Sequence, residues 1–256
     1  MKQEVSPCHW LTAEPLYCWT ISANIHGNVT LTIQQDKETF MLSFAEEIYL
    51  LALDETTGKP MISPKDIQMQ SALVGAILGE LSFFLRIDTD IDKIYLLNAT
   101  PVGNPVLDHA LSLISGSTES QSISFWMNEL RADTRFIEKH VLQELIDKKI
   151  LKQEDKKILW VFPTRQYPVI DGVELQNIER RLRNLILSDD IPEPRETVLV
   201  SLVDACGFFQ DILSPREFQR SKERIALLAR MDAIGRTVNN LIRVINKAYI
   251  MAIHIG

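Results

Sequence analysis

The fold is decided by one stretch of the sequence, Ser71-Ala-Leu-Val-Gly-Ala-Ile-Leu-Gly-Glu-Leu81. Small residues recur in it on nearby faces of a helix, which lets a second helix approach closely, while leucine and isoleucine supply bulk. The small residues are Ala72, Gly75, Ala76 and Gly79. Ser63-Pro64 is typical of a helix start, so the pattern predicts a core helix from there to about Leu85. This apolar run contains Glu80 and is shorter than the roughly 20 residues that cross a bilayer.

The sequence on either side of this core helix is also mostly helical. Ser43 and Glu46 have the spacing of a capping box, in which each side chain binds the other's backbone N–H. A helix to about Leu53 should follow, and Asp54–Gly58 should end it. Further helices fit residues 106–115, 121–131, 134–148, 173–188, 195–212, 215–230 and 233–254. The sequence therefore predicts a mainly α fold, a compact domain of about ten helices.

Short β-rich segments interrupt the helices. Ile158–Phe162 and Gln166–Ile170 flank a turn at Pro163–Arg165 and predict a projecting β-hairpin. Lys93–Leu97 is strand-like. Near the start of the chain, the alternating run Asn28–Gln34 predicts a short strand. We therefore expect residues 1–40 to form a small N-terminal extension of unknown role and residues 41–256 to form the helical domain.

The composition limits the class of partner and the compartment. The 256 residues hold 27 Lys and Arg against 34 Asp and Glu, a net charge of −7. This charge repels polyanions on average, so we do not expect nucleic acid as a partner.

The cysteines Cys8, Cys18 and Cys206 form neither an even framework nor a CxxC pair, which favours reduced thiols. No signal-peptide pattern follows Lys2, so a cytoplasmic location is expected.

The sequence contains no motif for catalysis, metal binding or cofactor binding. The five histidines lie outside the spacings that zinc sites use. Glycine-rich phosphate loops and the GxSxG motif are also missing from the sequence. Acidic pairs such as Glu46-Glu47 and Asp189-Asp190 fit helix ends and solvated loops better than paired acid and base. We therefore expect a protein that uses no metal or cofactor and is not an enzyme.

Several segments, taken in order, resemble one known family. The first is Leu42-Ser-Phe-Ala-Glu-Glu-Ile-Tyr-Leu-Leu-Ala-Leu-Asp-Glu-Thr-Thr-Gly58, followed by Ser71–Leu81 and by Pro101-Val-Gly-Asn-Pro-Val-Leu-Asp-His-Ala-Leu111. The match continues through Leu145–Leu151, Tyr167-Pro-Val169 and Val198–Leu202. Residues 41–250 thus resemble the Golgi phosphoprotein 3 family. The resemblance implies a helical domain with one hairpin and peripheral attachment to the cytosolic face of Golgi membranes. It also implies recognition of phosphatidylinositol 4-phosphate and an adaptor role for glycosyltransferases in coated vesicles.

The resemblance also locates an expected headgroup site. The Leu-Arg-Gly block of the family is Leu73-Val74-Gly75 here, and the tryptophan of the family's pocket falls near Lys65. Two further family arginines fall at Arg135 and Glu138. The residues expected to bind an anionic phospholipid headgroup are Arg135, Arg131, Lys139 and Lys65. Selectivity for phosphatidylinositol 4-phosphate should be reduced, because valine and glutamate replace two arginines that would donate hydrogen bonds.

The hairpin is a second expected contact surface, for a membrane or for a second subunit. An isolated two-stranded ribbon cannot bury both of its faces, so part of its apolar surface must find a partner. The residues concerned are Trp160, Phe162, Arg165, Tyr167 and Val169. Two functions stay open. One is a non-catalytic peripheral membrane protein that binds anionic phospholipid as an adaptor. The other is a cytosolic interaction module whose hairpin pairs subunits into a homo-oligomer without specific lipid binding.

Charge is distributed unevenly along the chain. Residues 1–60 hold three basic and eight acidic residues, whereas residues 216–247 hold eight basic and three acidic ones. Arg180, Arg181 and Arg183 add to the basic part. This polarity could orient the domain on an anionic surface or pair subunits head to tail.

Overall fold

The computed structural model describes residues 21–23, 29–31, 42–55, 57–63, 65–90, 92–158 and 162–237. The chain divides into two compact units, Met1–Met41 and Leu42–Gly256. In the first unit, strand β1 (Ile21–Ala23) pairs antiparallel with β2 (Val29–Leu31). Strand β2 falls within the run whose alternation predicts a strand.

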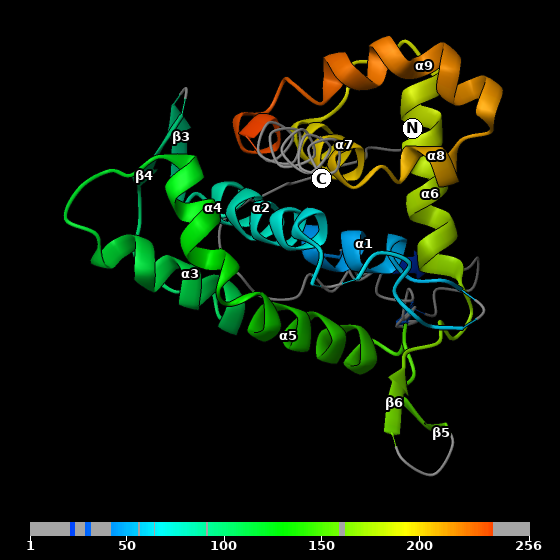
Figure 1. Cartoon of the computed structure of the whole chain (residues 1–256). Helices are drawn as coiled ribbons and strands as arrows, with labels where there is room; N and C mark the ends of the chain where they lie inside the picture. Colours follow the sequence, from blue (N-terminus) through cyan, green and yellow to red (C-terminus); the bar gives the residue numbers. More distant parts are fainter. Residues whose placement is uncertain are drawn as a thin grey trace, which may run out of the picture. The chain divides into compact units, whose positions relative to one another are not determined.

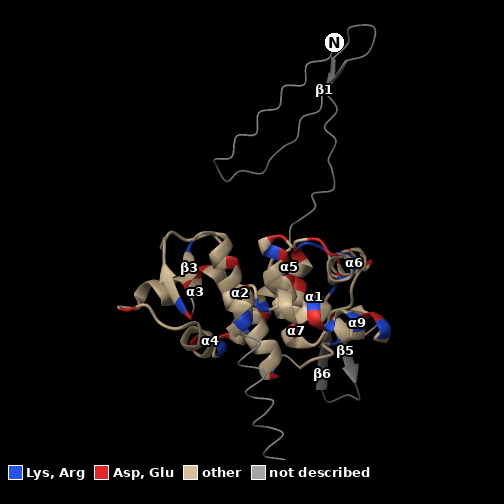
Figure 2. Cartoon of the chain, turned by 90° about the horizontal axis from the view of Figure 1, so that it is seen from above, with Lys and Arg blue, Asp and Glu red and all other residues tan. Residues whose placement is uncertain are grey.

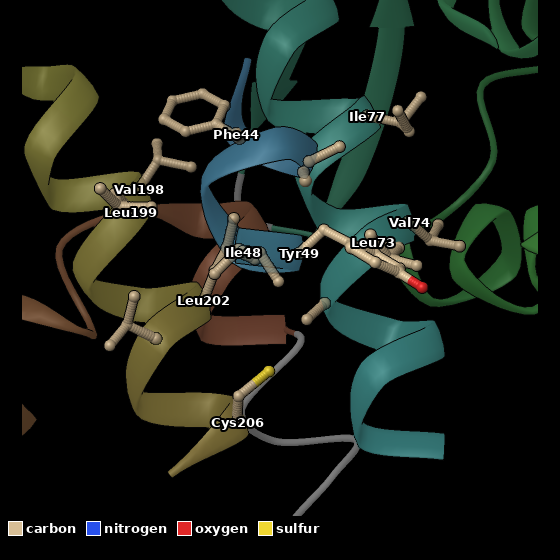
Figure 3. Close-up of a cluster of buried hydrophobic side chains, with 14 of the residues drawn as sticks. Phe44, Ile48, Tyr49, Leu73, Val74, Ile77, Val198, Leu199, Leu202 and Cys206 are labelled. Carbon is tan, nitrogen blue, oxygen red and sulfur yellow. The ribbon is translucent and has the colours of Figure 1, made fainter. Parts of the chain in front are cut away.

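The core of the second unit is built around helix α1 (Phe44–Leu51), in which every residue is buried. Helices α2 (Ile67–Phe83) and α7 (Pro194–Cys206) pack against α1 and against each other (Figure 1). Figure 3 shows their apolar side chains meeting in one cluster. A Cβ atom at Gly79 would lie 3.0 Å from Cγ1 of Val198, so glycine there allows α2 and α7 to approach closely. The core helix that the sequence predicts is confirmed.

The start and end of α1 follow from local chemistry. The backbone N–H of Ser43 donates to Glu46 Oε2 at 2.7 Å, and the N–H of Glu46 donates to Ser43 Oγ at 3.3 Å, which confirms the capping box. After the helix, Leu53 forms a β-bridge with Pro60. Gly58 between them has a φ of +61°, a backbone conformation that glycine adopts at low cost.

Helix α2 begins later than the sequence predicts. Asp66 is its N-cap, and the N–H of Ser63 donates to Asp66 Oδ2 at 3.2 Å. The N–H of Asp66 in turn donates to the backbone oxygen of Ser63. These bonds close a turn before the helix, so the helix start predicted at Ser63-Pro64 is wrong by about one turn.

The other helices surround this core. They are α3 (Pro105–Gly116), α4 (Ile123–Arg131), α5 (Thr134–Asp147), α6 (Val173–Leu187), α8 (Phe209–Ile212) and α9 (Pro215–Leu228). The single helix predicted over residues 195–212 is divided into α7 and α8, because Gly207 has a φ of +79° and ends α7. Residues 233–237 are helical, and the rest of the helix predicted over 233–254 lies outside the described residues. The mainly α fold is confirmed.

Two hairpins interrupt the helices of the second unit. Strand β3 (Ile87–Asp90) pairs antiparallel with β4 (Lys93–Leu96), which confirms the strand predicted near Lys93 and adds a partner that the sequence pattern does not reveal. Strands β5 (Glu154–Ile158) and β6 (Phe162–Gln166) form the second hairpin, which extends away from the helices (Figure 1).

The second hairpin has a different register from the predicted one. Its strands pair Glu154 with Gln166 and Ile158 with Phe162, so the turn precedes Phe162 and does not lie at Pro163–Arg165. The register differs because residues 168–170, which follow β6, pair with residues 150–152, which precede β5. Lys152 N–H donates to the oxygen of Pro168 at 3.0 Å, and Ile170 N–H donates to the oxygen of Ile150 at 3.0 Å. The predicted strands are therefore displaced by four residues.

Candidate functional site

Three of the four basic residues expected at a headgroup site lie together at the junction of α4 and α5. Helix α5 buries Ile137, Val141 and Leu145, which places Arg135 and Lys139, four residues apart, on its exposed side. Arg131 is half-buried at the end of α4. Among the described residues, none of these three side chains forms an ion pair or hydrogen bond. We call Arg131, Arg135 and Lys139 the α5 basic face.

An aromatic side chain lies beside these cations. Phe136 is 37% exposed, and its ring centroid lies 5.4 Å from that of His109 and 4.2 Å from that of His140. His109 is held by Asp133, with 3.0 Å between Nε2 and Oδ2. The α5 basic face thus borders an exposed ring supported by two imidazoles. The only sequence signal for this cluster is the i, i+4 spacing of Phe136 and His140 on a predicted helix, and it does not include His109.

Glu138, which stands at a family arginine position, faces the core instead of this surface. The hydroxyl of Tyr49 donates a hydrogen bond to Glu138 Oε1 at 2.9 Å. Burial, followed by the nearby carboxylate of Glu138, raises the pKa of Tyr49 well above its usual value. The phenol therefore stays protonated and able to donate, and Glu138 joins α5 to α1.

The other two positions of the expected site lie elsewhere. Val74 is 0% exposed and lies in the core on α2, where Figure 3 shows it near Leu73 and Ile77. Lys65 is exposed in the turn that precedes α2. Because Val74 lies in the core, it contributes nothing to a surface site.

The hairpin residues also separate into groups. Phe162 and Arg165 belong to β6, whereas Trp160 lies outside the described residues. Tyr167 and Val169 follow β6 and pack, partly buried, against the hydrophobic core. These last two side chains anchor the base of the hairpin, which leaves the strands themselves as the projecting part.

Three buried carboxylates of the core, Glu46, Glu47 and Glu80, are each bound by a basic side chain. Glu46 on α1 accepts two hydrogen bonds from Nζ of Lys148, at 2.6 and 2.7 Å. Glu47 accepts one from Arg181 on α6 at 2.5 Å. Burial raises the pKa of Glu47, against the opposing effect of the Arg181 guanidinium. These pairs fasten α1 to the segment after α5 and to α6.

Arg195 links three further parts of the core. Its guanidinium donates to Glu80 on α2 at 3.1 Å and to the backbone oxygen of Leu42 at 2.5 Å. It also lies 4.1 Å from the ring centroid of Phe44. Because each carboxylate is already held by a cation, this network is suited to holding helices together.

The described residues offer little other chemistry. Burial raises the pKa of the Cys206 thiol to about 12, so the thiolate is scarce at neutral pH. A cavity of about 20 Å³ lies between α1, α2, α3 and α5, and its lining is mostly apolar, with Ser43, Glu80, Asn104 and Glu144 as its polar residues. This volume is enough for a water molecule but not for an organic substrate.

Within the described residues, no group of three or more His, Cys, Asp or Glu side chains could hold a metal ion.

Comparison with known sequences agrees with the expected family. Residues 44–245 match the sequence model of Golgi phosphoprotein 3 (GPP34). The chain belongs to the Golgi phosphoprotein 3 family. It is also similar to the vacuolar protein sorting-associated protein 74 of Eremothecium gossypii, with 27% identity over 171 residues. That match covers 59% of this chain and 50% of the relative, so the chain spans about half the length of this relative.

The match to the family model includes both the α5 basic face and the hairpin. Within the residues that the structure describes, none of the helices combines the length and the apolar character needed to cross a bilayer.

Proposed function

We propose that this member of the Golgi phosphoprotein 3 family is a peripheral membrane protein whose α5 basic face contacts anionic phospholipid headgroups. The observation that carries the proposal is the exposure of Arg135 and Lys139, both without a partner among the described residues, beside the half-exposed ring of Phe136. Guanidinium and ammonium groups attract lipid phosphates, and an aromatic ring is suited to the headgroup layer.

Binding should depend on charge more than on headgroup identity. At the family arginine positions, Val74 lies in the core and Glu138 binds Tyr49, so neither can donate a hydrogen bond to a phosphate. Arg135 alone remains at these positions. Phosphatidylinositol 4-phosphate is therefore expected among the lipids that bind, but with a small advantage over other anionic lipids at equal surface charge.

The proposal assigns no catalytic step to the protein. The buried carboxylates are bound by cations, and the described cavity holds no more than a water molecule. A protein of this kind acts by holding partners at a membrane, which is the adaptor role implied by the family. Its place would be the cytosolic face of a membrane, the Golgi membrane in a eukaryotic cell.

Vesicle flotation tests the lipid part of this proposal. The full chain is mixed at low salt with neutral phosphatidylcholine vesicles, with phosphatidylserine vesicles, or with phosphatidylinositol 4-phosphate vesicles of equal surface charge. We expect recovery with both anionic vesicles and loss of recovery as salt rises, because the contacts are electrostatic. Equal recovery with neutral and anionic vesicles would remove the lipid claim.

A second candidate function is self-association through the hairpin. Strands β5 and β6 pair only with each other among the described residues, so each keeps a free edge that a second copy could extend. The molecular mass in solution decides this point. A monomer that is unaltered by Trp160→Ala would argue against it, whereas a dimer that this substitution dissociates would support it.

A further inference from the structure

A second charged surface lies on α9. This helix buries Ser221, Ile225 and Leu228 and turns its opposite side to solvent. Its exposed basic side chains are Arg216, Arg220 and Lys222, with Arg230 just beyond its end. None of these four forms an ion pair among the described residues. Glu217 on the same helix is already bound by Arg183 and Ser214, which leaves Glu223 as the exposed acidic residue of α9. The four cations outnumber it, and Figure 2 colours basic positions along α9.

Exposed apolar side chains gather at the C-terminal end of this surface. The guanidinium of Arg224 donates hydrogen bonds to the backbone oxygens of Leu185 and Asp190, which holds the loop after α6 against α9. Arg220, Arg224 and Leu227 are spaced i, i+4, i+7 and so share one side of the helix, and Glu223 lies on that side as well. The exposed apolar residues at this end are Leu187, Ile191, Leu227 and Met231. Ile191 is 90% exposed, and Leu227 is 63% exposed.

Arg216 and Arg220 lie toward the start of this surface, and the exposed apolar residues lie toward its end, where Arg230 also lies. Arg216 and Leu227 are eleven positions apart, about 16 Å along a helix at 1.5 Å per residue. About five residues of extended chain span the same distance. A segment that places carboxylates over Arg216 and Arg220 can therefore reach the apolar end with leucine or phenylalanine side chains a few residues away.

The acidic residues beside the apolar end favour a protein segment over a lipid surface. Asp189, Asp190 and Glu193 are exposed on either side of Ile191 in the sequence. If Ile191 entered an anionic membrane, these carboxylates would face the headgroups and be repelled. A protein segment whose charged end lies over the arginines avoids this repulsion. In Figure 1, α9 and α5 also lie on opposite sides of α1, so a flat membrane against α5 would leave α9 accessible.

We infer that the α9 surface, formed by Arg216, Arg220, Leu227 and Ile191, is a docking site for a protein segment that carries a cluster of acidic residues followed or preceded by apolar ones. The site is separate from the α5 basic face, and its test does not involve lipid binding by that face.

Fluorescence anisotropy with synthetic peptides tests the inference. The probe is a fluorescein-labelled peptide with four glutamates, a Gly-Ser spacer and the sequence Leu-Phe-Leu, made in both orders of the two blocks. A peptide of the same composition with alternating glutamate and apolar residues is the control. The full chain is compared with Arg216→Ala/Arg220→Ala, with Leu227→Ala, and with Arg135→Ala/Lys139→Ala. All substituted side chains are exposed, and circular dichroism confirms that each variant is folded.

One block peptide should bind about tenfold more tightly than the alternating peptide, as expected when charge and apolar contacts match in position. Both α9 variants should weaken that binding about tenfold, and the α5 variant should leave it unchanged. Equal binding of block and alternating peptides, or no effect of the α9 variants, would overturn the inference. So would α9 variants that bind the block peptide normally but lose binding to phosphatidylserine vesicles, because the surface would then bind lipid.

Discussion

The hydroxyl of Tyr49 lies 2.9 Å from Oε1 of Glu138 and donates a hydrogen bond to it. This bond joins the centre of the core to the helix that carries the α5 basic face. It also turns the carboxylate of Glu138 away from that face, where it would repel anionic headgroups.

Removing this hydrogen bond should weaken the fold. Tyr49→Phe keeps the ring but deletes the donor, which should lower the free energy of unfolding by about 1–2 kcal/mol. Tyr95→Phe is the matched control, because Tyr95 is exposed on β4 and should change stability by less than about 0.5 kcal/mol. Urea unfolding of the two variants provides the comparison, and equal losses would show that the Tyr49 bond contributes nothing.

A glycine in the turn before α2 should be essential for a close backbone contact. A Cβ atom at Gly58 would lie 2.3 Å from the backbone nitrogen of Pro168, and the φ of Gly58 is +61°. Gly58→Ala should therefore cost about 3 kcal/mol or more, since it adds a steric clash to the usual strain of about 1–2 kcal/mol.

Gly103 provides the control for the strain alone. It also has a positive φ, +88°, but nothing lies within 4 Å of its Cβ position. Gly103→Ala should thus lose only the strain energy, about 1–2 kcal/mol. If the two variants were equally stable in thermal and urea unfolding, the contact between Gly58 and Pro168 would not be as close as described.

Arg195 should be among the most important charged residues for stability. Arg195→Ala would leave Glu80 with only the hydrogen bond from the Phe44 N–H, and it would remove the donor to the backbone oxygen of Leu42. It would also remove the cation that lies 3.7 Å from Glu47 Oε2. Breaking a buried pair in this way typically costs about 3–5 kcal/mol. Arg216→Ala, on the exposed side of α9, should cost less than about 0.5 kcal/mol. A small effect of Arg195→Ala in denaturant unfolding would mean that water replaces its contacts.

Glu144 should make stability depend on pH. Burial, and then the nearby Glu46, raise the pKa of Glu144 above its usual 4.5. The folded chain therefore holds this proton more tightly than the unfolded chain does, and stability falls as pH rises through the interval above 4.5. Glu144→Gln removes the titration and can still accept the hydrogen bond from Asn104. Urea unfolding at several pH values should show a shallower decline for the variant, and an unchanged slope would contradict the shift.

The elements that the sequence predicts well are those fixed by local chemistry. The capping box of Ser43 and Glu46 involves residues three positions apart, and the small residues of α2 are visible in one short stretch. The i, i+4 spacing of Arg135 and Lys139 likewise places both on one exposed helix side. These features need no knowledge of the rest of the chain.

The elements that the sequence predicts poorly depend on distant partners. The hairpin register is set where residues 150–152, which lie outside both predicted strands, pair with residues 168–170 at the end of the second predicted strand. Glu138 faces inward because of Tyr49, a residue 89 positions away. Neither the register nor the direction of this carboxylate can be inferred from a local pattern, and both affect the candidate surfaces.

The central claim, that the α5 basic face binds anionic lipid, is tested most directly by vesicle flotation of two charge-matched double variants. Arg135→Ala/Lys139→Ala removes two cations from that face, and Lys59→Ala/Lys93→Ala removes two exposed lysines elsewhere. Each cation near a membrane contributes about 1 kcal/mol, so the first variant should partition into phosphatidylserine vesicles about 30-fold less than the unmodified chain at low salt. The second should partition almost as the unmodified chain does. Equal partition of the two variants would contradict the claim.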